Sequence, residues 1–172
     1  MIKLTIEELI VVNPWNKEHL ELIENYEKEN EINTKTSSYL KRMNQMSEEE
    51  YKNYKRTTNE IKESLLLKKE NQIKDTCHIE GEKDRKVCNI SFSPIRTKLK
   101  NRRMITLAID YAFHILKMES IFVKISQEDK NMIENLEIRG FENLGKENND
   151  IIYLKENEEI KDNKGTYHEN SR

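Results

Sequence analysis

The sequence is poor in cysteine, proline and glycine, and it has no long apolar run. Its 172 residues include only 2 cysteines, 2 prolines and 4 glycines. So few cysteines argue against a disulfide-stabilised secreted domain and favour a reduced, cytoplasmic protein. No apolar stretch approaches the roughly 20 residues that cross a bilayer. The segment MIKLTIEELIVVNPW also carries acidic residues within its apolar part, unlike a signal peptide. We therefore expect no membrane association.

Neither sign of charge predominates. The chain has 30 Lys and Arg residues against 32 Asp and Glu residues, which gives a formal net charge of -2. A dedicated nucleic-acid binder usually carries a basic excess, so a nucleic-acid partner is not expected. Charged residues make up 36% of the chain and hydrophobic residues 35%. This composition predicts one core beneath a strongly ionic surface.

The length fits one domain, which we expect to span residues 1–156. The carboxy-terminal segment KENEEIKDNKGTYHENSR has almost nothing apolar after Ile160. A segment of this composition cannot bury enough apolar surface to fold. Residues 157–172 are therefore predicted to form a disordered tail.

The first sixty residues predict one strand and two helices. Leu9–Trp15 is rich in β-branched residues and predicts a strand, and NKEHLELIENYEKEN has apolar residues at helical spacing. Ser47 and Glu50 form a capping box that opens a second helix. The intervening NTKTSSYLKRMNQ fits either a loop or a short helix. The apolar stripe expected along the second helix consists of Tyr51, Tyr54, Thr58 and Ile61.

The remainder predicts mostly strands, with two helices between them. SLLLKKE is a short strand, QIKDTCHIEGEKDRKVCNISFS is a hairpin that turns near EKDR, and FENLGKENNDIIYLKE closes the chain with two strands around a polar turn. The helices are Arg103–Lys117 and a segment capped by Ser126 and Asp129 that ends on Gly140. The predicted order is β, α, α, β, β, β, α, β, α, β, β.

One connection in this order specifies topology. The helix Arg103–Lys117 joins a strand that ends near Ser93 to a strand that starts near Ser120. A crossover helix of this kind joins parallel strands. We predict an α/β fold with a mixed α+β sheet, in which these two strands are adjacent, parallel and separated where the following loop begins.

That loop and the start of the helix are strongly basic. The cations are Arg96, Lys98, Lys100, Arg102 and Arg103. A helix N-terminus already carries about half a positive charge, so cations there are unfavourable unless an anion lies between them. Free backbone N–H groups at the same place make a site for phosphate. A solvated charge cluster or a nucleic-acid patch are the alternatives that the residues alone leave open.

The order of elements resembles the GNAT superfamily of acyl-CoA-dependent N-acetyltransferases over roughly Glu8–Glu156. The string DYAF, at Asp110–Phe113, is similar to that of ribosomal-protein acetyltransferase-like members, and ENLEIRGFENLGK, at Glu134–Lys146, resembles the family's helix and the GF…G turn that follows it. The resemblance implies a central mixed six- to seven-stranded sheet flanked by about four helices. It also implies acetyl-CoA as co-substrate and direct transfer to a primary amine of a small molecule or protein. We expect a monomer or homodimer.

The resemblance also implies where acetyl-CoA binds. In the family, a loop of the form Q/R-x-x-G-x-G/A holds the pyrophosphate, and counting back from DYAF places Arg96, Leu99 and Asn101 on its defined positions. Asp129 stands where many members have an Asn that contacts the cofactor. Backbone near Phe92 and Ser93 is expected to hydrogen-bond the thioester oxyanion. The implied cofactor-binding residues are Phe92, Ser93, Arg96, Lys98, Leu99, Lys100, Asn101, Arg102, Arg103 and Asp129.

Several positions depart from the family pattern. Leu99 replaces a glycine, Leu136 stands at the usual general-acid tyrosine, and the strand VCNISFS has no carboxylate. The sequence therefore identifies no catalytic acid or base, although Glu80 is the nearest candidate for a base, and it shows no metal site. His78 is expected to have a structural role. A GNAT-fold binding or regulatory module without turnover is the second hypothesis.

Overall fold

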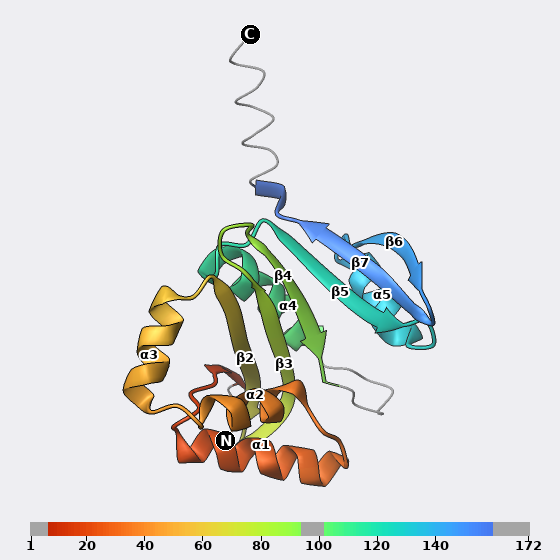
Figure 1. Ribbon diagram of the computed structural model, residues 1–172. Coiled ribbons are helices and arrows are strands. Elements are labelled where there is room, and N and C mark those ends of the chain that lie inside the picture. The colour runs from red at the N-terminus through yellow and green to blue at the C-terminus, as the bar shows by residue number, and fades with distance from the viewer. Residues whose placement is uncertain (1–6, 94–101, 160–172) are drawn as a thin grey trace, which may run out of the picture.

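A seven-stranded mixed sheet forms the centre of the computed structural model, which describes residues 7–93 and 102–159 (Figure 1). The sheet order is β1-β2-β3-β4-β5-β7-β6, and every described pair of neighbours is antiparallel except β4 with β5. The strands are β1 (Glu7–Val11), β2 (Glu60–Lys69), β3 (Gln72–Glu82), β4 (Val87–Phe92), β5 (Ser120–Ser126), β6 (Glu142–Glu147) and β7 (Asp150–Glu156).

The helices of the described residues cover both faces of this sheet. They are α1 (Lys17–Asn30), α2 (Lys35–Met43), α3 (Glu48–Thr57), α4 (Arg102–Asp110) with its π-helical continuation (Tyr111–Ile115), and α5 (Lys130–Ile138). The predicted mixed α/β fold is confirmed, and the described residues form seven strands and five α-helices instead of about four. The predicted tail lies outside the described residues from residue 160 onward. In the part of the chain that is described, no helix is long and apolar enough to span a membrane.

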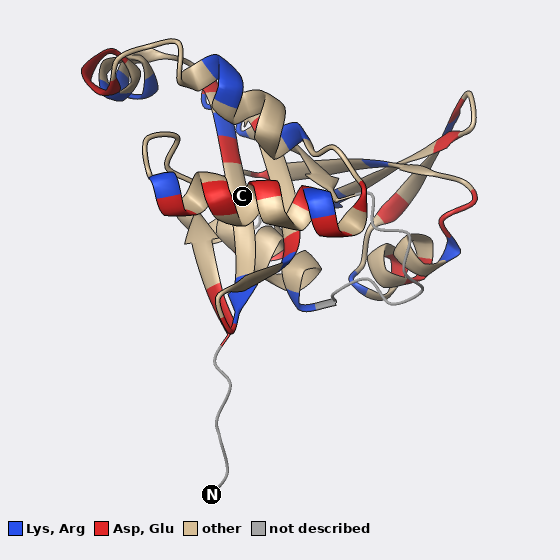
Figure 2. Ribbon diagram, turned by 90° about the horizontal axis from the view of Figure 1, so that it is seen from below, with Lys and Arg blue, Asp and Glu red and all other residues tan. Residues whose placement is uncertain are grey.

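Alternating side chains of the strands build two cores. Leu65 and Leu67 of β2 pack with α4 and α5 on one face, whereas Leu66 packs with α1 and α2 on the other. Each of these leucines is fully buried. Figure 2 shows acidic and basic residues along the outer side of α1, whose Ile23 and Tyr26 face the sheet.

Two sequence-based boundaries are corrected by tertiary pairing. The helix opened by Ser47 ends at Thr57, so Thr58 and Ile61 do not continue its apolar stripe. Ile61 instead belongs to β2, where it is buried opposite Gly81 of β3. The helix after β5 is capped by Asp129, whose carboxylate accepts a hydrogen bond from the Met132 N–H at 3.2 Å. Ser126 is therefore not its N-cap residue.

The segment NTKTSSYLKRMNQ, for which the sequence allowed either a loop or a short helix, forms α2. The Thr34 hydroxyl caps this helix by accepting a hydrogen bond from the Ser37 N–H at 3.2 Å. Tyr39, Leu40 and Met43 then lie on its buried side. These contacts place the start of α2 beside the middle of β3 and the end of β4, where the candidate site lies.

The predicted parallel pair is confirmed. Val87, Cys88 and Asn89 of β4 lie opposite Ser120, Ile121 and Phe122 of β5. Beyond Asn89 the ladder stops, although β4 continues to Phe92 and β5 continues to Ser126. Figure 1 shows the two strands diverging from this point. The separation opens the sheet beside the end of β4.

Cys77 and Cys88 are both buried as free thiols on neighbouring strands. In the ladder, Cys77 lies opposite Phe92 and Cys88 lies opposite Gly81, so the two cysteines are offset along the strands. Burial raises the pKa of Cys77 well above its ordinary value and that of Cys88 to about 12. Both thiols are therefore protonated at neutral pH.

We expect iodoacetamide to leave both cysteines unmodified in native protein at pH 8, because the thiolate is the reactive form and neither thiol is exposed. In denaturant, both should be alkylated within minutes, and mass spectrometry of the two samples makes the comparison. Rapid modification of native protein, or a 77–88 bridge in protein kept from air oxidation, would contradict this expectation.

Candidate active site

A cavity of about 450 Å³ lies where β4 and β5 separate. Its walls come from the middle of β3, from the ends of β4 and β5, from the connection between α1 and α2, and from the start of α5. The lining side chains used below are Lys35, His78, Ser91, Phe92, Lys124 and Asp129. A volume of this order is typical of small-molecule sites, which occupy roughly 300–1,000 Å³.

The backbone of β4 presents different residues to its two neighbours. The Ser93 N–H donates to the Thr76 carbonyl of the β3 side at 3.1 Å. Because antiparallel ladders alternate, Ser91 and Ser93 turn their backbone groups toward β3, and Phe92 turns its N–H and C=O toward β5. At Phe92 the ladder with β5 has already ended. Of the two backbone donors expected from the sequence, Phe92 therefore faces the opening, and Ser93 does not.

Ser93 instead fixes the end of β4 to helix α1. Its hydroxyl lies 2.9 Å from the Tyr26 hydroxyl, and both side chains are buried. Burial raises the pKa of Tyr26, so this phenol remains protonated at neutral pH. The contact holds the end of β4 beside the opening.

Apart from Phe92 and Ser93, the predicted cofactor-binding residues fall into three groups. Arg96, Lys98, Leu99, Lys100 and Asn101 lie outside the described residues. The remaining cations belong to the first turn of α4, which begins at Arg102. The Arg103 guanidinium, through Nε, lies 2.9 Å from the carboxylate of Glu7 on β1. Asp129 lines the cavity while it caps α5.

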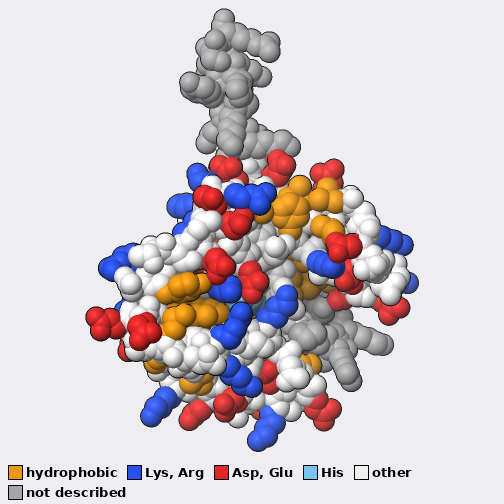
Figure 3. Space-filling model, viewed as in Figure 1, with side chains coloured by type: hydrophobic (Ala, Val, Ile, Leu, Met, Phe, Trp, Pro, Cys, Tyr) orange, Lys and Arg blue, Asp and Glu red, His pale blue; other side chains and the backbone are white. Residues whose placement is uncertain are grey.

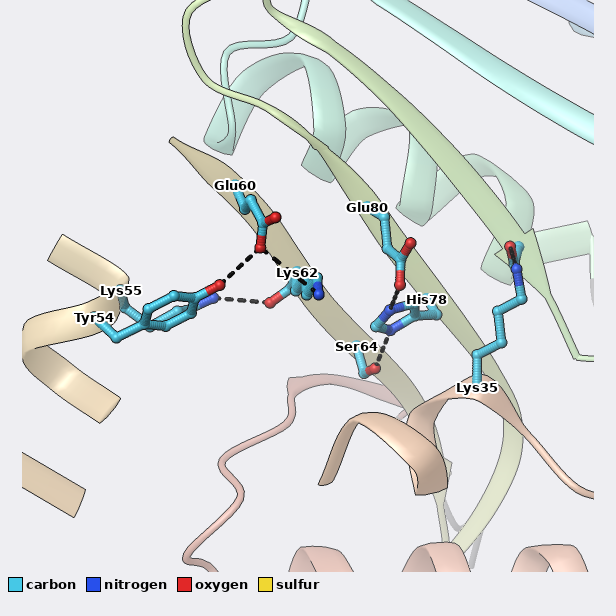
Figure 4. A network of polar contacts seen from close by, with 9 residues as sticks. Lys35, Tyr54, Lys55, Glu60, Lys62, Ser64, His78 and Glu80 are labelled. Atoms are coloured by element: carbon cyan, nitrogen blue, oxygen red, sulfur yellow. Dashed lines mark hydrogen bonds and ion pairs between the residues drawn. The ribbon is translucent and has the colours of Figure 1, made fainter. Parts of the chain in front are cut away.

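A chain of three side chains lies on the face of the sheet that also carries α1 and α2 (Figure 4). The Ser64 hydroxyl is 2.7 Å from His78 Nδ1, and His78 Nε2 is 3.0 Å from the Glu80 carboxylate. The His78 ring also packs against Tyr39, with 5.4 Å between ring centroids. His78 is therefore a buried, hydrogen-bonded residue, as the sequence favoured, but its partner is the candidate base Glu80.

The exposed end of this chain reaches a second hollow. This hollow has a volume of about 370 Å³ and is lined in part by Glu80 and Asp150. It shares Lys35, Ser91 and Lys124 with the first cavity. The Lys35 ammonium donates to the Ser91 hydroxyl at 3.1 Å. Figure 3 shows acidic and basic side chains gathered together on this face of the molecule.

Sequence reasoning missed the Ser64–His78–Glu80 chain. The contact between His78 and Glu80 could have been predicted, because residues two apart on a strand lie on the same face. The position of Ser64 depends on the β2–β3 register, which places it opposite His78. Among the described residues, no group of three or more His, Cys, Asp and Glu side chains could hold a metal ion.

No protein-family model and no curated protein matches the sequence. Solved structures do match the fold. A ribosomal-protein-S5-alanine acetyltransferase from Vibrio fischeri aligns with a TM-score of 0.65 at 14% identity, over 90% of this chain and 97% of the other. Mutant forms of the spermidine/spermine N-acetyltransferase SpeG from Vibrio cholerae align with a TM-score of 0.62 at 14% identity, over 92% and 98%.

A third similar structure was solved with a ligand. The N-acetyltransferase PseH from Campylobacter jejuni, in complex with acetyl coenzyme A, aligns with a TM-score of 0.59 at 15% identity, over 88% of this chain and 99% of the other. Identities this low establish architecture only. The seven-stranded sheet, its one short parallel pair and the helices on both faces give this chain the fold of the GNAT N-acetyltransferases.

Proposed function

We propose that this protein transfers an acetyl group from acetyl-CoA to a primary amine of a small molecule or a protein. The observation that carries the proposal is the opening between β4 and β5, with the backbone of Phe92 directed into it. The acetyl-CoA complex of PseH, a protein of similar fold, supports the choice of acyl donor.

The described residues fit such a donor. The pantetheine arm of CoA carries amide groups, which can pair with an exposed strand edge as an added strand does. Phe92 offers an N–H and a C=O on one side of the opening. On the other side of the opening, the Gln127 N–H donates to the Asn149 carbonyl and therefore faces β7. Backbone groups of successive strand residues face opposite neighbours, so those of Lys124 and Ser126 face β4. The pyrophosphate is proposed to lie at the start of α4, among Arg96, Lys98 and Arg102.

The chemistry follows from this placement. The lone pair of a neutral amine attacks the thioester carbonyl carbon, which forms the C–N bond and converts the carbonyl oxygen to an oxyanion. The Phe92 N–H is directed so that it can donate to this oxygen. Collapse of the adduct breaks the C–S bond, and CoA leaves as a thiolate that takes up a proton. The nitrogen loses one proton, so the reaction needs a proton acceptor.

The first test is a thermal shift with acetyl-CoA, with CoA and without ligand. A ligand present at 100 times its dissociation constant stabilises the native state by about 2.7 kcal/mol. We expect both compounds to raise the Tm. The second step measures thiol release from acetyl-CoA with a panel of primary amines, including spermidine, amino acids and an N-terminal peptide. No Tm shift at millimolar acetyl-CoA and no thiol release would contradict the proposal.

The alternative function, a binding or regulatory module without turnover, is supported by one position. Leu136, which stands where the family's usual general-acid tyrosine would be, is fully buried. No hydroxyl is therefore available from this position to protonate the departing thiolate. A clear Tm shift with acetyl-CoA, combined with no thiol release in the presence of any amine, would favour this module.

A further inference from the structure

We propose that Glu80 is the proton acceptor for the attacking amine, and that His78 and Ser64 position its carboxylate. This inference rests on the proposed acetyl transfer. It assigns the role for which the sequence offered no clear residue. It follows from the accessibility of the three side chains and from their directions, which Figure 4 shows.

The first argument is accessibility along the chain. Ser64 is fully buried, the His78 side chain is 2% exposed, and the Glu80 side chain is 47% exposed. A Ser–His–Glu arrangement can serve as a nucleophile with its base, but such a nucleophile must reach the substrate. Here the serine lies at the closed end and the carboxylate at the open end. The chain can therefore act only through Glu80.

The second argument is the position of the proton on His78. Burial lowers the pKa of His78 against the opposing effect of Glu80, so the ring is neutral at neutral pH. An ionised carboxylate only accepts hydrogen bonds, so Nε2 carries the proton and donates to Glu80. Nδ1 then accepts from the Ser64 hydroxyl. Each buried polar atom of the ring has one defined partner, which fixes the direction of the Glu80 carboxylate.

The third argument is location. Glu80 lines the hollow that shares Lys35, Ser91 and Lys124 with the cavity between β4 and β5. Val123 and Ile79 pack with α4 and α5 on one face of the sheet. Because neighbouring residues of a strand point to opposite faces, Lys124 and Glu80 lie on the face that carries α1 and α2. The Glu80 carboxylate is therefore accessible from the α1 and α2 side of the sheet, in a hollow next to the cavity.

Charged groups from every adjoining element surround this chain. Lys62 of β2 lies directly opposite Glu80, and Asn89 of β4 is its partner on the other side. From α2, the positive charges of Lys35 and Arg42 act on His78 and add to the lowering of its pKa. The remaining neighbours are Lys124 and Asp150. Because most of these charges are positive, the hollow is not an acidic trap for cations, and the role of Glu80 depends on its geometry.

The decisive variant is Glu80→Gln, which keeps the size of the side chain and removes the proton acceptor. General-base catalysis contributes roughly 10²–10⁴-fold, so we expect kcat to fall by about 100-fold or more. The dissociation constant for acetyl-CoA and the Tm should remain close to wild type. The matched control is Glu82→Gln, on the same strand and face and ion-paired with Arg85, which should leave kcat unchanged.

The pH profile separates a lost base from a distorted site. Without Glu80, only amine that is already neutral can react, so log(kcat/KM) of Glu80→Gln should rise by about one for each pH unit up to the pKa of the acceptor. Wild type should level off at a lower pH. A merely structural defect would lower both profiles by a constant amount. Glu80→Asp, which keeps a carboxylate on a shorter side chain, should be intermediate.

The positioning role is tested by two substitutions of His78. The side-chain amide of His78→Gln can still donate to Glu80, so kcat should stay within about fivefold of wild type. His78→Leu removes the donor and should lower kcat by about tenfold or more, with KM for acetyl-CoA unchanged. Equal losses in both variants would show that the histidine acts only through packing.

The outcomes distinguish this inference from the proposed function. If wild-type protein acetylates no amine, the proposed function fails, and the role of Glu80 fails with it. If wild type is active and folded Glu80→Gln retains kcat within threefold with an unchanged pH profile, only the assignment of Glu80 is overturned.

Discussion

Replacing Arg96, Lys98 and Arg102 together by alanine is expected to weaken acetyl-CoA binding by several kcal/mol and to leave folding stability almost unchanged. Each charge-assisted hydrogen bond to a phosphate contributes about 1.5–3 kcal/mol. Cations near a helix N-terminus oppose the helix dipole, so their removal should not destabilise α4. Isothermal titration calorimetry measures the binding loss, and urea denaturation measures the free energy of unfolding.

The structure supplies a matched control for this variant. Arg103 belongs to the same basic segment, but its guanidinium pairs with Glu7 of β1 at 2.9 Å. Arg103→Ala should therefore change the acetyl-CoA dissociation constant by less than about threefold. Equal losses in Arg103→Ala and the triple variant would indicate a general electrostatic effect. Wild-type affinity in the triple variant would leave the basic segment without a role in cofactor binding.

Gly81→Val is expected to destabilise the fold by about 3 kcal/mol or more, at the upper end of what overpacking usually costs. Gly81 lies opposite Cys88 in the β3–β4 ladder. A Cβ at this position would lie 2.4 Å from the Val87 carbonyl oxygen and 2.8 Å from Cys88 Cα and Cβ. Most of these atoms belong to the backbone of the paired strand, so they cannot move aside without disturbing the ladder.

Urea denaturation with a tryptophan fluorescence signal would measure this effect, because the chain has a single tryptophan. The control is Glu82→Val on the adjoining position, where the side chain is half-buried and the cross-strand partner is Val87. That change should stay within about 0.5 kcal/mol. An unfolding free energy for Gly81→Val close to that of wild type would mean that β3 and β4 are farther apart than the structure has them.

The sequence predicted those parts of the fold that depend on local pattern. The hairpin of β3 and β4 followed from two strand patterns around a polar turn, and the parallel pair followed from one crossover helix. The predicted end of α3 was wrong because Ile61 fits helical spacing as well as strand pairing. The burial of Ile61 opposite Gly81 in the sheet favours the strand. The spacing of residues within one segment contains no information about a partner on another strand.

The candidate site was predictable to a smaller extent, for a related reason. Phe92 was named as a backbone donor from the expected strand separation, but the choice between Phe92 and Ser93 required the alternation with β3. The Arg103–Glu7 ion pair joins residues that are far apart in the sequence. The order Ser64, His78, Glu80 depends on a strand register, and a shift of one residue would place Ser64 on the opposite face.

The short ladder between β4 and β5 has a consequence for the cooperativity of the molecule. Among the described residues, only three register pairs join strands β1 to β4 of the sheet with strands β5 to β7, whereas β5 and β7 alone share seven. Strands β2 to β4 and β5 to β7 are each internally antiparallel, so the parallel junction is the boundary at which subglobal unfolding should separate them. One apolar core continues beneath this boundary, so the junction is weak in its backbone ladder and not in its packing. A ligand of the proposed kind, bound in the opening, would contact both sides and thereby reinforce the shortest ladder of the sheet.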